Sequence, residues 1–130
     1  MGAWGQETFE NDWALDWVYA LEESEDFSVI EETLANINMT EEQPENDACC
    51  EARAAAEVVA ALRGKPAAKL PDEVQTWLKG KPKPTEALVA EAIRALDRIL
   101  KDSETKALWE ETEYYVAWKT SVEELRSRLA

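Results

Sequence analysis

The sequence contains no histidine among its 130 residues. Histidine is the commonest general base, the usual partner of a serine or cysteine nucleophile, and the imidazole ligand of most zinc sites. Glycine-rich phosphate loops, EF-hand spacings and paired CxxC motifs are absent as well, which excludes the common nucleotide, calcium and zinc motifs. We therefore predict that the chain is not an enzyme and that it binds no cofactor.

Glycine and proline are scarce, with four and five copies, and no segment alternates apolar and polar residues for long enough to predict a strand. No apolar run approaches the roughly 20 residues that a membrane span requires. The two cysteines, Cys49 and Cys50, are neighbours. Adjacent cysteines form only a strained disulfide, so we expect reduced, half-buried thiols. These features indicate a cytoplasmic helical protein.

Apolar residues recur with helical spacing and predict an all-α fold. We expect a single helical domain over residues 1–130, arranged as a bundle or array of five to six helices. A short extended arm is expected at 1–10, with Trp4 and Phe9 packed onto the body, and loops are expected at 39–46 and 64–70. The polar residues near Glu111 interrupt the apolar stripe of the last helix, and the sequence leaves open whether that helix is broken there. The expected N-caps are Asn11 or Asp12, Asp47, Thr85 and Ser103, and the expected helix stops are Gly64 and Gly80.

Charge is distributed unevenly along the chain, whose net charge is −14. Residues 1–52 contain fifteen Asp or Glu and no Lys or Arg, whereas residues 53–130 contain 13 acids and 14 bases. Such an acidic block repels nucleic acids and anionic membranes and attracts cationic partners. Our first hypothesis is therefore a protein-binding module, of an immunity or regulatory type, for a basic protein. An alternative is a structural protein whose acidity maintains solubility.

The segment from Arg63 to Lys83 carries the opposite charge, with six Lys or Arg and two acids. Such a segment is able to bind an external anion. The acidic half of the same chain is the nearer counter-charge, and we expect it to neutralise this segment. The sequence leaves the oligomeric state open.

A small group of oxygen ligands supports a second hypothesis. Asp12 and Asp16 lie one helical turn apart, directly after Glu10 and Asn11. Carboxylate and amide oxygens are the ligands of Ca²⁺ and Mg²⁺, so these residues are candidates for a metal-dependent carboxylate enzyme. In the interpretation that we favour, Asn11 or Asp12 caps the helix and Asp16 anchors the arm around Trp4.

Glu57 is the one charged residue in the apolar run at 54–62. A buried carboxylate at this position would be a candidate functional group. We favour the simpler interpretation, in which Glu57 lies on a solvated strip beside Arg53, four residues earlier in the helix.

The opening motif reads MGAWG at residues 1–5 and FEND at 9–12, followed by Ala14, Asp16 and Trp17. Later segments include AAAEVVAAL at 54–62 and the closing stretch at 122–129. In these segments the chain resembles a bacterial family of small proteins that is known only as a domain of unknown function. The resemblance is weaker over residues 22–50, and it implies no activity. The motif positions that it singles out are Trp4, Gly5, Phe9, Asn11, Asp12 and Asp16.

Overall fold

The computed structural model describes residues 5–130, and in that range it contains seven helices and no β-strand. The predicted all-α class is confirmed, and the predicted number of helices is too low. The difference arises at the C-terminal end, where the polar residues after Glu110 separate two helices. The helices are α1 (Asp12–Glu22), α2 (Ser28–Asn38), α3 (Asn46–Leu62), α4 (Asp72–Leu78), α5 (Glu86–Lys101), α6 (Glu104–Glu110) and α7 (Tyr115–Leu129).

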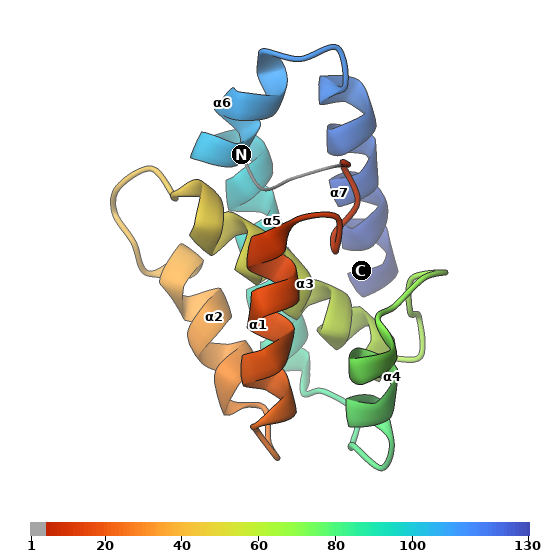
Figure 1. Ribbon diagram of the computed structural model, residues 1–130. Helices are drawn as coiled ribbons and strands as arrows, with labels where there is room; N and C mark the ends of the chain where they lie inside the picture. Colours follow the sequence, from red (N-terminus) through yellow and green to blue (C-terminus); the bar gives the residue numbers. More distant parts are fainter. Residues whose placement is uncertain (1–4) are drawn as a thin grey trace.

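Helix α3 lies at the centre of the molecule and contacts each of the other helices (Figure 1). Every residue from Ala52 to Ala60 is buried, so this part of α3 is enclosed on all sides. Five of those nine residues are alanine, and small side chains allow neighbouring helices to approach closely. The alanine-rich composition therefore explains the central position of α3.

Helices α1, α2, α5 and α7 pack around α3, and α2 also packs directly against α5 (Figure 1). The buried face of α1 is the stripe that its sequence predicts, namely Ala14, Trp17, Val18 and Leu21. The indole Nε1 of Trp17 donates a hydrogen bond of 2.7 Å to Thr33 Oγ1 on α2. This bond satisfies two buried polar groups and fixes α1 against α2.

Local capping chemistry sets several helix ends. The side chains of Asn11, Thr85 and Ser103 each accept a backbone N–H in the first turn of α1, α5 and α6. Asp47 does not cap α3, whose N-cap residue is Glu45, two residues earlier, and the side chain of Glu45 makes no capping hydrogen bond. The two glycines that follow α3 and α4 have positive φ angles of 88° and 77°, which is the helix-ending conformation that glycine favours.

The N-terminal residues depart from the predicted extended arm. Residues 5–10 follow bends and a turn, closed by a hydrogen bond of 3.2 Å from the N–H of Glu10 to the carbonyl oxygen of Glu7. Phe9 is half-buried against the core, as predicted. Trp4 lies outside the described residues, and so does its expected contact with Asp16. Within residues 5–130, none of the helices has the length and apolar character needed to cross a bilayer.

Candidate functional site

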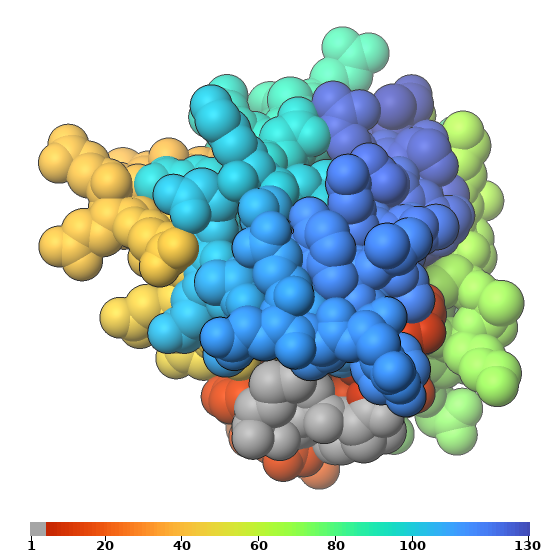
Figure 2. Space-filling model, turned by 90° about the horizontal axis from the view of Figure 1, so that it is seen from above, coloured from red at the N-terminus to blue at the C-terminus, as the bar shows by residue number. Residues whose placement is uncertain are grey.

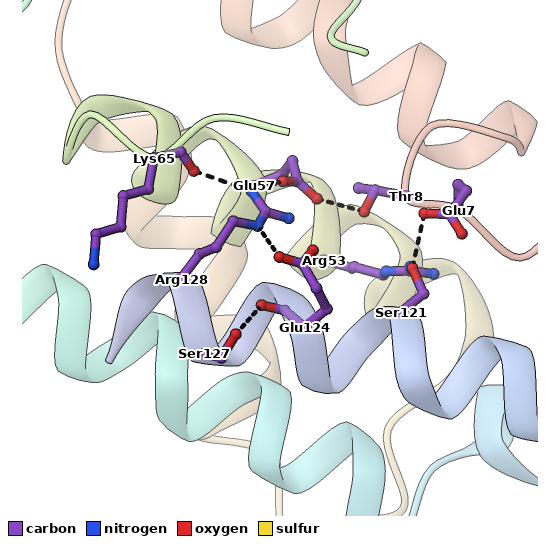
Figure 3. A network of polar contacts seen from close by, with 9 residues as sticks. All are labelled: Glu7, Thr8, Arg53, Glu57, Lys65, Ser121, Glu124, Ser127 and Arg128. Carbon is purple, nitrogen blue, oxygen red and sulfur yellow. Dashed lines mark hydrogen bonds and ion pairs between the residues drawn. The ribbon is translucent and has the colours of Figure 1, made fainter. Parts of the chain in front are cut away.

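A network of charged and hydroxyl side chains joins the N-terminal residues to α3 and α7 (Figure 3). At its centre is Glu57, of which only 2% is exposed. Its Oε2 accepts a hydrogen bond of 2.7 Å from Thr8 Oγ1, and its Oε1 lies 2.6 Å from Nη1 of Arg128. The prediction of a solvated Glu57 is therefore wrong. Glu57 is buried because α3 is central, and α7 supplies the counter-charge.

Arg128 links three parts of the network. Besides contacting Glu57, its Nε donates a hydrogen bond of 2.7 Å to Glu124 on the same helix. Its Nη1 donates one of 3.1 Å to the carbonyl oxygen of Lys65, in the loop after α3. Burial alone lowers the pKa of Arg128, but the hydrogen bonds and the negative charges of Glu124 and Glu57 together outweigh burial and raise it. Arg128 therefore remains a cation in this half-buried position.

Arg53 links the N-terminal segment to α7 by hydrogen bonds. Its Nη1 donates a hydrogen bond of 2.6 Å to the carbonyl oxygen of Gln6, and its Nη2 donates one of 2.6 Å to Ser121 Oγ on α7. Ser121 Oγ in turn donates to Glu7 Oε1 at 2.9 Å. Burial lowers the pKa of Arg53, and the nearby carboxylate of Glu57 opposes that shift. One buried cation thus fixes the N-terminal turn against two helices.

The acidic half of the chain remains exposed in the folded protein. Thirteen of its fifteen carboxylate residues are exposed, and only Glu10 and Glu51 are half-buried. Within the part of the chain that the structure describes, none of the fifteen forms an ion pair with Lys or Arg. We expected these acids to neutralise the segment from Arg63 to Lys83. That expectation is wrong for direct contacts, because no ion pair joins the two groups among the described residues. The six basic residues of that segment also form no ion pair with a described residue.

The solvent-facing side of α1 combines acidic residues with an aromatic one. Asp12, Asp16 and Glu23 are exposed at helical spacings, and Tyr19 lies among them with 67% of its surface exposed. Helix α2 lies beside α1 (Figure 1) and adds the exposed Glu31 and Glu32. We use the name acidic face for the exposed residues Asp12, Asp16, Tyr19, Glu23, Glu31 and Glu32, of which Glu23 directly follows α1.

The proposed metal ligands do not converge. Among residues 5–130 no group of three Cys, Asp or Glu side chains is arranged to hold a metal ion. Glu10 Oε1 instead accepts the N–H of Glu7 at 3.1 Å, while Asp12 and Asp16 point into solvent. The structure thus gives no support to a carboxylate metal site at these residues.

Comparison with known proteins places this arrangement in a family. A family model described as Domain of unknown function (DUF4259) matches residues 2–121. The chain belongs to this family. Neither a curated protein nor a solved structure matches it. The family match covers the N-terminal segment, α3 and Ser121 of the network, whereas Arg128 lies beyond the matched range.

Two residues of the N-terminal segment, Gly5 and Asn11, have a structural explanation in this chain. A Cβ atom at Gly5 would lie 2.5 Å from the carboxyl group of Glu10, so glycine allows the turn to close over that side chain. Asn11 is buried, and its side chain both caps α1 and donates a hydrogen bond of 3.2 Å to the carbonyl oxygen of Thr8. Two of the candidate oxygen ligands, Glu10 and Asn11, therefore shape the N-terminal turn.

Sequence reasoning missed Thr8, Ser121 and Arg128, which complete the network around Glu57. Thr8 and Ser121 carry ordinary hydroxyls with no recognisable spacing, and Arg128 lies 71 residues from its partner. The one available signal was Glu57 itself, an acid inside an apolar run. A buried carboxylate requires a counter-charge, but the sequence does not identify which arginine supplies it.

The two cysteines are poor nucleophiles in the folded protein. Both are free, with Cys49 buried and Cys50 half-buried. Burial raises the pKa of Cys49 to about 11 and that of Cys50 to about 12. Since the thiolate is the reactive form, the structure favours packing as the role of this pair, in agreement with the sequence interpretation.

Proposed function

We propose that the chain is a protein-binding module whose acidic face binds a basic protein, in an immunity-type or regulatory role. The observation that carries this proposal is the exposure of thirteen of the fifteen N-terminal carboxylates without an ion pair to any described residue. Their negative potential is therefore not cancelled by direct contacts within the chain. We place this activity in the cytoplasm, where free thiols such as Cys49 persist.

The composition of the acidic face suits recognition of a cationic surface. Clustered carboxylates accelerate encounter with a basic partner and reject acidic ones. Tyr19 supplies an exposed aromatic ring among them, and tyrosine is one of the residues that most often dominates binding energy at protein interfaces. The proposal assigns no catalytic step to the chain.

The test is capture from a native lysate of the source organism at low salt, followed by identification of the retained protein by mass spectrometry. The variant Asp12→Asn/Asp16→Asn/Glu23→Gln removes three charges from the acidic face. We expect the wild type to retain a basic protein and this variant to lose it. With the purified partner, we expect the Kd to rise about tenfold between low and physiological salt, because exposed charges are screened.

A matched variant controls for net charge. Glu111, Glu113 and Glu123 are exposed and unpaired within the described residues, and they lie outside the acidic face. Their triple change to glutamine alters the net charge by the same amount and should leave capture intact. Equal loss of capture in both variants would show that only net charge matters. If no basic protein is captured at any salt concentration, the proposal is wrong, and the acidity serves solubility alone.

A further inference from the structure

A groove of about 670 Å³ opens beside the N-terminal end of α1. Its walls are residues 7–10 of the N-terminal turn, residues 66–69 of the loop after α3, and the C-terminal half of α7. Figure 2 shows these three segments meeting on one side of the molecule, in red, light green and dark blue. The volume falls within the range of small-molecule and peptide sites, roughly 300 to 1,000 Å³.

Part of the groove wall is apolar and part of it is acidic. The apolar residues that line the groove are Phe9, Pro66, Ala67 and Ala68. Carboxylates line the rest of it, at Glu7, Glu10, Glu57 and Glu124.

Several carboxylate oxygens at the rim have no partner among the described residues. Glu7 accepts only through Oε1, from Ser121, and Glu10 only through Oε1, from the N–H of Glu7. The Oε2 atom of each accepts no hydrogen bond from residues 5–130. Lys69, the exposed cation at the rim, forms no ion pair with a described residue. The second cation, Arg128, is already occupied by Glu57 and Glu124. The groove therefore offers two carboxylate oxygens that accept no hydrogen bond from the described residues, and apolar residues lie in the same groove.

We infer that this groove receives a short segment of the basic partner and holds one lysine or arginine side chain of it. The aliphatic stem of such a side chain packs on the apolar wall while its charged end reaches the carboxylates of Glu7 and Glu10. This inference rests on the proposed function and adds the anchoring site to it. Glu10 lies two residues before Asp12, which is the first residue of α1 and part of the acidic face, so the groove adjoins the acidic face along the chain.

The inference is tested with capped tripeptides and ¹⁵N-labelled protein. Acetyl-Ala-Lys-Ala-amide, at millimolar concentration, should give saturable NMR shifts at Ala67, Ala68 and Ser121. The matched peptide with glutamate in place of lysine should give none. The variant Ala68→Trp fills the groove from an exposed position and should weaken lysine-peptide binding by about tenfold or more, the scale of losing one good contact. Ala90→Trp, exposed on α5, should bind the peptide as the wild type does.

Each contrary result has a definite meaning. Lysine-peptide shifts confined to α1 and α2, no saturable shift, or equal binding of the glutamate peptide would each overturn the groove assignment. Full capture of the partner by Ala68→Trp would also overturn it while leaving the proposed function intact. If the lysine peptide saturates the groove but no basic protein is captured, the groove remains a cation site and the proposed function fails.

Discussion

The buried ion pair between Glu57 and Arg128 leads to a quantitative prediction about stability. Replacing Glu57 by glutamine preserves the side-chain shape and an acceptor for the hydroxyl of Thr8. It removes the negative charge that α3 places against Arg128 of α7. It also removes the carboxylate that most favours the charged form of Arg53, a buried cation. Breaking a buried pair by removing one partner costs about 3 kcal/mol or more. We therefore expect Glu57→Gln to lose about 3 kcal/mol, which corresponds to about 10 °C in Tm for a chain of this size.

The assay is urea unfolding, followed by tryptophan fluorescence and far-ultraviolet circular dichroism. Coincident transitions with an unchanged m-value would establish that the loss lies in folding free energy. A double-mutant cycle with Arg128→Met separates the pair from its neighbours. We expect a coupling of about 1 to 3 kcal/mol between the two sites, because residues in contact are not additive.

The control is the exposed pair of Asp97 and Arg126 on α5 and α7. Asp97→Asn should cost no more than about 1 kcal/mol, since exposed pairs contribute little. If Glu57→Gln costs as little as Asp97→Asn, Glu57 is solvated as its sequence context suggests, and the argument for a charged network beneath the N-terminal turn is refuted.

Further predictions concern single sites. Alkylation of Cys49 and Cys50 by iodoacetamide at pH 8 should be on the order of 100-fold slower in the folded protein than in urea, because burial keeps the thiols protonated. The raised pKa values also make the free energy of unfolding fall as the pH rises from the unfolded value of 9.0 toward about 11, because the unfolded chain releases thiol protons that the folded chain retains. A flat urea midpoint over that range would contradict this. Thr85→Ala removes the N-cap of α5 and should cost about 1 kcal/mol in urea unfolding. Gly5→Ala should cost about 1 kcal/mol through its clash with Glu10, and no loss at all would show that the turn has room.

Local chemistry explains which parts of the fold were predictable. The stripe of Ala14, Trp17, Val18 and Leu21 follows from helical periodicity, and the cap at Thr85 follows from hydrogen bonds within one turn. Each depends on neighbours a few residues away, so the sequence carries the whole signal. The break after Glu110 was not decided by the sequence, because polar residues that interrupt an apolar stripe are compatible with a continuous helix as well as with two helices.

The prediction failed where distant parts of the chain meet. Glu57 and Arg53 are four residues apart and look like an exposed helical pair, yet both are buried. Their environment is decided by α7 and by the N-terminal turn, which only the tertiary structure brings together. The start of α3 was missed by two residues because Asp47 is a good cap in isolation, whereas the N-cap residue in the structure is Glu45 and the helix begins at Asn46. The side-chain amide of Asn46 instead accepts a hydrogen bond of 2.7 Å from Thr105 on α6.

The unpaired carboxylates also affect the stability of the chain. Like charges gathered on α1 and α2 repel one another and lower the stability of the compact state. Six basic residues between Arg63 and Lys83 would relieve that repulsion through direct contacts, but the fold holds them in the loops around α4, where they pair with none of these acids among the described residues. The relief must therefore come from outside the chain, from dissolved salt or from a cationic surface. A basic partner brings fixed cations to the acidic face, so its binding should raise the urea midpoint beyond the plateau that added salt reaches, whereas a solubility role predicts the salt effect alone.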